Sequence, residues 1–554
     1  MYGRKSIAKD RNYMITLTGK KVSEGIVMGR LMFFNRGERE IRRFYVEDVN
    51  KEIGRFQKAR ERAISDLQEL CNDSVKEVGE TNAMIFEIQQ MLLEDGDFID
   101  SVTNIIREQK MNAEYAVKTG AESFIENFGK QDTGYVRGHE ADVRDVATRI
   151  LRVLSRVRRD KMFFDEPYIM AAKDLYPSEA VMLDKAKALG FVTMYGSINS
   201  HTAVLARTRG IPSIIGLGEA LKKDYDGKTV IIDGFEGKLY IEPDQSTMAR
   251  MMEKKKRNIK TIEALERLKG KENVTQSGQR IDVCANIGSR EDIESVLRND
   301  ANGIGLFRSE FLYMESGGKL PTEEQQFQVY QLAAEAMGPK KVVIRTADIG
   351  GDKRVEYLGL PAEANPMMGY RGIRISLDKN EMFKVQLRAI LRASAYGNIA
   401  IMFPMITAVE EVVAAKKILE KAKEELRSEK VAFNDHIEIG AMIETPAAVL
   451  ISGELAREVD FFSIGTNDLT QHTLAMDRQN GRLTNHYNPH HPALIKMIRI
   501  VANNVHLEGK RISICGDLAA DTTMTEMFIQ MGIDELSVAP SKVLPLRKRI
   551  REIQ

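Results

Sequence analysis

The chain has 554 residues, a length typical of three or four domains. Its 81 basic and 80 acidic side chains nearly cancel, which argues against a nucleic-acid binder that depends on bulk charge. Three scattered cysteines are too few for a disulfide framework, and no apolar run approaches the ~20 residues of a membrane span. We therefore expect a cytoplasmic protein without a nucleic-acid partner or membrane insertion.

The first half of the chain alternates between two patterns of apolar residues, one typical of mixed β and α structure and one typical of helices. Residues 1–13 are basic and lack an apolar core after them, so they are interpreted as a disordered extension rather than a signal peptide. Residues 14–36 alternate like strands, and a β and α pattern returns at 167–243. Between them, residues 46–158 repeat apolar side chains at helical spacing with few glycines and prolines. This order predicts one α/β domain with a helical domain inserted into it.

The second half of the chain is more regular. Residues 245–273 are charged and poor in glycine, which predicts a linker helix. Eight short apolar strand candidates follow, starting near residues 280, 303, 341, 399, 437, 461, 511 and 535. Eight strand–helix units in this length favour a closed TIM barrel over the alternative, a doubly wound open sheet. The expected parts are an extension at 1–13, an α/β domain at 14–35 and 159–244, a helical domain at 36–158, a linker helix at 245–273 and a barrel at 274–554.

One segment of the α/β part has the character of a phosphoryl-accepting site. His201 stands between the hydroxyl side chains of Ser200 and Thr202, after a strand pattern and at the start of a helix pattern. Free N–H groups and the dipole at a helix start favour an anion, and neutral imidazole is a good nucleophile near pH 7. The pattern makes His201 a candidate for a phosphorylated histidine.

The ends of the expected barrel strands bring acidic, basic and thiol side chains together, because active sites of TIM barrels lie at that face. Arginines there suit a phosphate and a carboxylate, which guanidinium binds with two hydrogen bonds. Two carboxylates on neighbouring strands suit Mg²⁺ or Mn²⁺, and a thiol suits proton transfer to carbon. The residues at the strand ends are Arg308, Glu310, Arg345, Asp348, Glu444, Asn467, Asp468 and Cys515.

Some other histidines and cysteines are expected to have no direct role in the chemistry. His490 and His491 lie in a polar loop without a ligand partner at metal-binding spacing, so we expect them to be solvated. Cys71 and Cys284 are expected to be small buried apolar residues. Lys353 follows two glycines after a strand, a pattern that also exposes backbone N–H groups to phosphate.

Several segments occur in a fixed order from about residue 14 to the end. They are Ala141-Asp-Val-Arg-Asp-Val146, Ser200-His-Thr-Ala-Val-Leu-Ala-Arg207, Gly303-Ile-Gly-Leu-Phe-Arg-Ser-Glu-Phe-Leu-Tyr-Met314, Arg345-Thr-Ala-Asp-Ile-Gly-Gly-Asp-Lys353, Asn365-Pro-Met-Met-Gly-Tyr-Arg371, Met442-Ile-Glu-Thr-Pro-Ala447, Asp460-Phe-Phe-Ser-Ile-Gly-Thr-Asn-Asp-Leu-Thr-Gln471, Asp477-Arg478 and Cys515-Gly-Asp-Leu-Ala519. With these motifs the chain resembles Enzyme I, the phosphoenolpyruvate–protein phosphotransferase family of the bacterial sugar phosphotransferase system.

The resemblance implies a role for each part. The phosphoryl group of phosphoenolpyruvate would move to His201 and then to the histidine-containing phosphocarrier protein HPr, which would dock on the helical domain. Glu444 and Asp468 would hold Mg²⁺, and Cys515 would protonate enolpyruvate to give pyruvate. A homodimer through the barrel is also implied. The implied phosphoenolpyruvate-binding residues are Arg308, Arg345, Asn467, Arg478, Lys353 and Arg371.

The departures from the family pattern gather around the histidine. The family's Gly-Gly-x-Thr-Ser-His loop is Gly196-Ser-Ile-Asn-Ser-His201 here, and Ala180 replaces a threonine. The early Ser-Pro-Gly turn reads Ser23-Glu-Gly25. Losing a hydroxyl partner changes the orientation or pKa of the histidine without abolishing transfer.

Two alternatives remain beside this hypothesis. Pyruvate phosphate dikinase and phosphoenolpyruvate synthase share the histidine domain and the barrel, but they need a large ATP-binding domain before the histidine. About 200 residues precede His201, and most of them have a helical pattern. A catalytically weakened paralogue that serves as a regulatory or scaffold phosphoprotein is the other alternative.

Overall fold

The computed structural model divides the chain into two compact units, Met1–Lys260 and Thr261–Gln554. The side chains at 73–84, 127–130, 140–141, 177, 181, 201, 204, 208 and 356 lie outside the description. Among the described helices, none combines the length and the apolar character that crossing a bilayer requires. The structure describes residues 14–34, 41–78, 80–130, 140–155, 166–181, 183–184, 186–196, 201–290, 292–314, 319–351, 353, 355–360, 363–478, 480, 483 and 486–554.

The first unit contains one eight-stranded sheet, in the order β1-β8-β7-β3-β4-β5-β6-β2. Strand β3 pairs in parallel with β4 and antiparallel with β7, so the strands before and after the helical region form a single sheet. Strand β2 was missed by sequence analysis because its four residues lack a clear apolar alternation. The strands are β1 Ile15–Thr18, β2 Lys20–Ser23, β3 Ile26–Phe33, β4 Tyr168–Ala172, β5 Ala188–Thr193, β6 Ser213–Ile215, β7 Thr229–Asp233 and β8 Lys238–Ile241.

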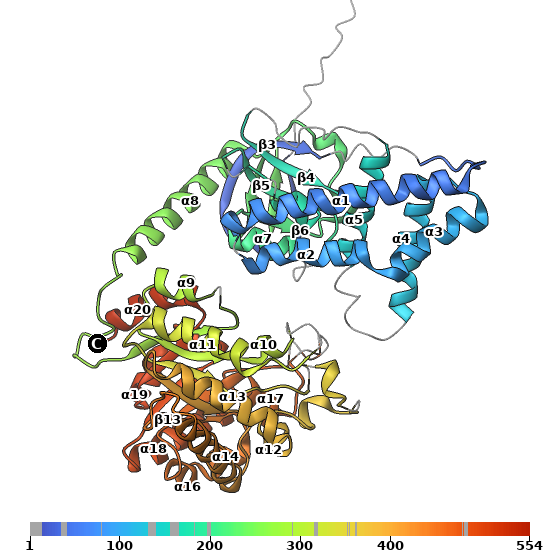
Figure 1. Cartoon of the computed structure of the whole chain (residues 1–554). Helices are drawn as coiled ribbons and strands as arrows, with labels where there is room; N and C mark the ends of the chain where they lie inside the picture. The colour runs from blue at the N-terminus through green and yellow to red at the C-terminus, as the bar shows by residue number, and fades with distance from the viewer. Residues whose placement is uncertain are drawn as a thin grey trace, which may run out of the picture. The chain divides into compact units, whose positions relative to one another are not determined.

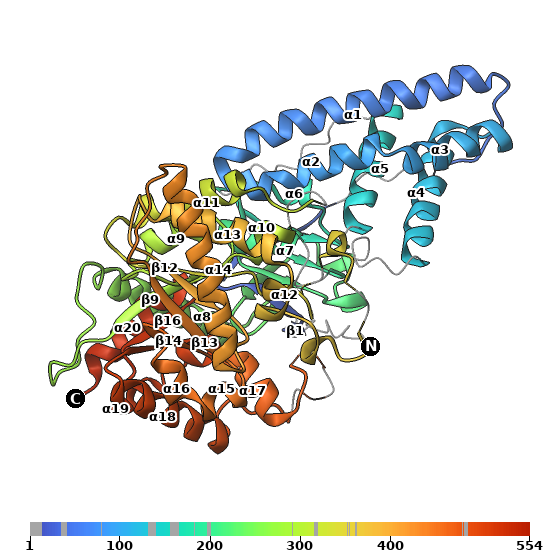
Figure 2. The ribbon, with the colours of Figure 1, turned by 60° about the horizontal axis from the view of Figure 1, so that its bottom comes forward.

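The inserted helices follow the predicted apolar periodicity. Asp95 caps α3 by accepting the N–H of Phe98, which marks a break between α2 and α3. A further break at Lys110, whose φ is 51°, was not predicted because lysine carries no turn signal. Helices α1 and α2 run side by side in both whole-chain views (Figures 1 and 2). The helices are α1 Val49–Val78, α2 Glu80–Glu94, α3 Gly96–Gln109, α4 Ala113–Lys130 and α5 Glu140–Leu154.

The two faces of the sheet bury different cores, as alternation along a strand requires. Tyr168 and Met170 of β4 pack with the helical core, whereas Ile169 and Ala171 of the same strand pack into a core on the opposite face. Two short helices, α6 (Pro177–Val181) and α7 (His201–Arg209), complete the helical side. The insertion therefore shares one continuous apolar core with the sheet.

The long helix α8 (Gln245–Glu266) follows the sheet (Figure 1). Its first turns are fixed to the sheet by buried Met251 and by an ion pair of 2.6 Å between Lys254 Nζ and Asp233 Oδ2. The helix ends seven residues before the predicted end at 273, and turns follow it at residues 267–270.

The second unit is a closed barrel of eight parallel strands, which excludes the open-sheet alternative and confirms the predicted fold class. Strand β16 pairs with β9 and closes the ring. Val343 of β11 points into the barrel with Met402 and Cys515, whereas its neighbour Ile344 packs outward under the helices. The strands are β9 Asp282–Ile287, β10 Ile304–Arg308, β11 Val342–Arg345, β12 Ile399–Phe403, β13 Glu438–Ile443, β14 Phe461–Gly465, β15 Arg511–Cys515 and β16 Glu535–Val538.

Helices surround the barrel strands (Figure 2). Each long helix turns an apolar face to the strands, and α11 begins with a capping box between Thr322 and Gln325. The helices are α9 Asp292–Arg298, α10 Glu310–Met314, α11 Glu323–Met337, α12 Ile373–Asp378, α13 Asn380–Ala393, α14 Val409–Ser428, α15 Pro446–Leu450, α16 Ser452–Ala456, α17 Thr466–Leu474, α18 Pro492–Leu507, α19 Thr525–Gln530 and α20 Val543–Glu552.

Arg547 of α20 ties the start of the second unit to its end. Its side chain donates to Asn273 Oδ1 at 2.7 Å and to Asp300 Oδ2 at 2.6 Å. We expect Arg547→Ala to lower the free energy of unfolding by about 3 kcal/mol, because buried Asn273 and half-buried Asp300 lose their donor. Hydrogen exchange resolved by peptides of β9–β16 measures this loss. Arg549→Ala removes a half-exposed ion pair on the same helix and should cost under about 1 kcal/mol; equal losses in both variants would contradict the prediction.

Candidate active site

The predicted site residues of the second unit gather at one mouth of the barrel. Arg345 and Cys515 are the last residues of β11 and β15. Glu444 directly follows β13, and Asp468 lies in the first turn of α17, after β14. Because all eight strands are parallel, these ends lie at the same face. The barrel thus concentrates acid, base and thiol groups that are far apart in the sequence.

A buried carboxylate organises the positive side chains at this mouth. Asp348 is fully buried, and its Oδ2 lies 2.8 Å from Lys353 Nζ, 2.9 Å from Arg371 Nη2 and 3.4 Å from Arg345 Nη2. Burial by itself raises the pKa of Asp348, but the charges of Lys353, Arg345 and Arg371 outweigh it and hold the pKa well below its ordinary value. Asp348 is therefore ionised and holds three cations together.

Glu310 supplies a second anion to the same cluster. Its Oε1 accepts a hydrogen bond from Arg345 Nη2 at 2.8 Å and one from the N–H of Asp348 at 3.0 Å. Burial by itself lowers the pKa of Arg345. The negative charges of Glu310 and Asp348 raise the pKa by more than burial lowers it, so the guanidinium stays charged in the interior. Sequence analysis placed Glu310 and Asp348 at strand ends but gave them no role, because ion pairing needs the folded geometry.

Two further carboxylates lie beside the cationic cluster. Glu444 is 1% exposed and accepts the N–H of Met405 at 2.7 Å. Burial, together with the negative charges of Asp468 and Asp348, raises its pKa. Asp468 Oδ1 is buried without a hydrogen-bond donor among the described residues, and Arg371 Nη1 lies 3.6 Å from it.

This carboxylate pair fits a divalent cation. Among the described residues, the Oδ1 atom of Asp468 is buried without a donor, and the charge of Asp468 opposes the ionisation of Glu444. A positive ion between the two carboxylates would stabilise both. Gly465 leaves space there, since a Cβ at this position would lie 2.9 Å from Glu444 Oε2. The described residues contain no group of three or more His, Cys, Asp or Glu side chains suited to a metal. Glu444 and Asp468 alone suit Mg²⁺, which keeps waters and substrate oxygens as its other ligands.

Cys515 lies inside the barrel at the same mouth. Its side chain is buried, and Ser463 Oγ donates to its sulfur at 3.2 Å. Burial raises the pKa of the thiol to about 11. The group is therefore protonated at neutral pH, which suits a proton donor and excludes a resting thiolate.

The remaining predicted ligands surround these groups. Arg308 ends β10 with an exposed side chain. Asn467 pairs with Asp517, donating to its carboxylate at 3.3 Å and accepting its N–H at 3.1 Å. The backbone N–H of Arg478 donates to Gln471 Oε1 at 3.1 Å, which anchors the loop after α17.

His201 belongs to the first unit, and its side chain lies outside the described residues, as does Ser200. The structure does show that His201 is the first residue of α7, as the sequence predicted. Thr202, the neighbouring hydroxyl residue, donates to the carbonyl of Leu175 at 2.7 Å. Ala180, which replaces the family threonine, is buried.

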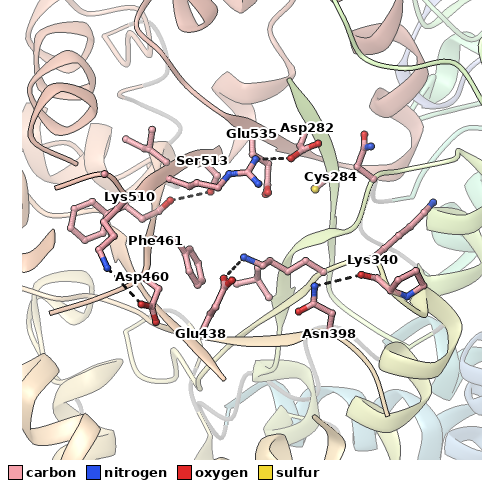
Figure 3. A pocket seen from close by; sticks show the side chains of 18 residues that line it. Asp282, Cys284, Lys340, Asn398, Glu438, Asp460, Phe461, Lys510, Ser513 and Glu535 are labelled. Atoms are coloured by element: carbon pink, nitrogen blue, oxygen red, sulfur yellow. Dashed lines mark hydrogen bonds and ion pairs between the residues drawn. The ribbon is translucent and has the colours of Figure 1, made fainter. Parts of the chain in front are cut away.

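A hollow lies at the opposite end of the barrel strands from the barrel mouth (Figure 3). It measures about 600 Å³ and is lined by strand starts such as Arg511 and Glu438. Its bases are already paired with acids: Arg511 with Asp282 at 2.6 Å, and Lys341 with Glu438. Because these charges are compensated and lie at the stable face of the barrel, this hollow is a poor site for an anionic substrate.

The sequence matches three family models in order. They are the PEP-utilising enzyme N-terminal part over residues 18–138, the mobile domain over 164–237 and the PEP-binding domain over 263–554, where PEP is phosphoenolpyruvate. The order of these models is the order of the parts described above.

Three curated relatives match nearly the whole chain. The phosphoenolpyruvate-protein phosphotransferase of Bacillus sp. (strain S) is 38% identical over 97% of this chain and 93% of its own length. The protein of the same name from Bacillus subtilis (strain 168) is 38% identical over 98% of this chain and 95% of its own. The one from Haemophilus influenzae is 38% identical over 97% and 94%. The three family models match in order, and the similarity to each relative extends over nearly its whole length. The chain therefore belongs to the phosphoenolpyruvate–protein phosphotransferases.

Proposed function

We propose that His201 carries the phosphoryl group in the reaction of this family. The chain is an enzyme that transfers the phosphoryl group of phosphoenolpyruvate to HPr, a protein of the sugar phosphotransferase system. The observation that best supports a donor site in the barrel is the cluster of Arg345, Lys353 and Arg371 around the buried carboxylate of Asp348. Such a cluster suits a substrate that combines a phosphate with a carboxylate.

The cationic cluster binds and orients the substrate. Arg345, Lys353 and Arg371 neutralise the phosphate oxygens, while Arg308, Asn467 and Arg478 contact the remaining polar atoms of phosphoenolpyruvate. Because the transferred phosphoryl group spreads charge over its oxygens, fixed cations lower the barrier without having to reorganise. Their buried ion pairs with Asp348 and Glu310 hold them in place before substrate arrives.

Glu444 and Asp468 hold Mg²⁺, or Mn²⁺, next to these cations. When bound, the metal neutralises charge on the phosphate oxygens and helps to orient them. The two carboxylates fix the position of that charge, since both are buried against the ends of β13 and β14.

The chemical steps use the chain's own nucleophile and acid. An imidazole nitrogen of His201 attacks phosphorus, and the bond between phosphorus and the enol oxygen breaks, releasing enolpyruvate. The Cys515 thiol then gives its proton to the methylene carbon, which forms pyruvate, and water restores the thiol proton. Phosphohistidine finally passes the group to the histidine of HPr, which regenerates neutral His201.

The remaining assignments complete the proposal. The helical domain at 36–158 docks HPr, the phosphohistidine domain covers 14–35 and 159–244, and the linker at 245–273 joins them to the barrel at 274–554. The barrel also forms a homodimer, and the enzyme works in the cytoplasm. Since His201 and the barrel mouth belong to different compact units, transfer requires those units to meet.

Labelled phosphoenolpyruvate with Mg²⁺ tests the central role of His201. We expect acid-labile, base-stable label on the wild-type protein and none on His201→Ala, because phosphohistidine has that stability. Mass spectrometry of the labelled peptide identifies the site. A wild-type protein without label would refute the proposal, and labelling from ATP would favour a dikinase.

Cys515→Ala should slow pyruvate formation by about a hundredfold or more, because carbon protonation loses its acid. The thiol is needed protonated, and its pKa is about 11, so its contribution should stay constant through neutral pH and fall only as the pH rises toward that value. Lactate dehydrogenase coupling measures pyruvate. The control is Cys284→Ala, a buried thiol at the opposite hollow, which should keep the wild-type rate. A normal rate in Cys515→Ala would exclude the thiol as the acid.

Removal of the metal tests the carboxylate pair. We expect chelation to stop labelling and Mg²⁺ or Mn²⁺ to restore it. Asp468→Asn should weaken Mn²⁺ binding about tenfold or more, since one charged ligand is lost. Electron paramagnetic resonance of free Mn²⁺ measures this affinity. Asp517→Asn is the control, because Asp517 lies beside Asn467 at the same mouth without belonging to the pair; equal weakening in both variants would argue against a site at Glu444 and Asp468.

A further inference from the structure

A chain of buried polar contacts crosses the first unit from the inserted helices to the helix that begins with His201. It starts at α2, passes through α5 and the segment 175–183 around α6, and ends on α7. None of these contacts belongs to the barrel mouth. This series of polar contacts therefore links the proposed HPr-docking part to the proposed phosphorylated residue within one compact unit.

Asp145 of α5 is the centre of this chain. It is 4% exposed, and its Oδ1 accepts the hydroxyl of Ser178 at 2.9 Å. Its Oδ2 accepts the N–H of Ser178 at 3.3 Å and the side-chain amide of Gln89, from α2, at 3.1 Å. A single buried carboxylate thus joins α2, α5 and α6 through three donors.

A neighbouring carboxylate reinforces the same segment. Glu179 is 1% exposed; its Oε2 accepts the N–H of Tyr176 at 2.9 Å, and its Oε1 lies 3.4 Å from Arg152 Nη2 of α5. Burying such charges is costly unless they are paired, so moving this segment away from α5 is unfavourable.

The same segment holds both ends of α7. Thr202, next to His201, donates to the carbonyl of Leu175 at 2.7 Å. Arg209, the last residue of α7, donates to the carbonyls of Ala180 and Leu183, both at 2.7 Å. The orientation of α7 is therefore set by the segment 175–183, whose own position depends on Asp145.

We infer that Asp145 is a positioning residue for His201: it fixes the helix of the phosphorylated histidine to the inserted helices through Ser178, the segment 175–183, Thr202 and Arg209. This inference rests on the proposed role of His201. At position 180 the side chain is a methyl group, and the contact to α7 there is made by the main-chain carbonyl. The buried polar chain gives α7 an anchor that needs no side-chain hydroxyl at that position.

Asp145→Asn tests the inference in the full-length enzyme. The new amide N–H₂ faces donors of Ser178 or Gln89, so the side chain can no longer accept from both residues. The size of the side chain changes little. We expect the single-turnover rate of His201 labelling to fall about tenfold to a hundredfold, since small misplacements of a nucleophile are costly. The KM for phosphoenolpyruvate should stay unchanged, because its proposed ligands are in the barrel.

Arg209→Lys approaches the same chain from α7. Lysine cannot bond both carbonyls in the geometry of the guanidinium fork, so we expect a loss in the same step with unchanged KM. The double variant should lose less than the product of the two single effects, because both act on one chain of contacts. If Asp145→Asn unfolds, the labelling rate of Arg209→Lys alone tests the inference.

Val102→Ala is the matched control. Val102 is fully buried in α3 and belongs to the same helical core, but the described contacts of the polar chain do not include it. It should lower the thermal stability while leaving the labelling rate unchanged. Normal labelling in both Asp145→Asn and Arg209→Lys would overturn the inference, as would an equal loss of rate in Val102→Ala. Absence of label in the wild-type protein would instead refute the role of His201.

Discussion

The barrel mouth depends on the burial of one carboxylate, Asp348. Isolated cations taken out of water lose several kcal/mol of solvation each, so three of them gather in an interior only around an anion. Asp348 supplies that anion, and Glu310 adds a second from the neighbouring strand end. The protein thus holds these three cations, the proposed phosphate ligands, in a fixed arrangement that does not rely on flexible surface lysines.

The charge balance of the mouth also explains why a metal fits it. Adding Glu444 and Asp468 to the cluster gives four carboxylates against three cations, an excess of one negative charge if all are ionised. Burial, together with the negative charges of Asp468 and Asp348, raises the pKa of Glu444, so ionising all four carboxylates is unfavourable without a further positive charge. A divalent cation held by Glu444 and Asp468, as proposed above, would make this cluster net positive, as an anionic substrate requires. Metal and substrate are therefore expected to favour each other's binding.

Much of this architecture could be predicted from the sequence. Short apolar runs separated by helical periods indicated the eight parallel strands, and their parallel order was enough to bring Arg345, Glu444 and Cys515 to one mouth. Partnerships between side chains were beyond prediction, because the pairing of Glu310 with Arg345 depends on strand register. Strand β2 and the break at Lys110 were missed because local sequence there carries no apolar alternation or turn residue.

The two ends of the reaction place different demands on the fold. The barrel needs fixed charges, and it obtains them from rigid strand ends and buried ion pairs. In the proposed mechanism His201 serves two partners in turn, so its helix has to keep one orientation within its own unit. Buried hydrogen bonds suit that task, because breaking one inside a protein leaves unpaired groups that water does not reach. Asp145, Thr202 and Arg209 satisfy this condition with main-chain and buried partners. At Ala180, the departure whose surroundings are described, the main-chain carbonyl accepts from Arg209 and so supports α7 without a side-chain hydroxyl.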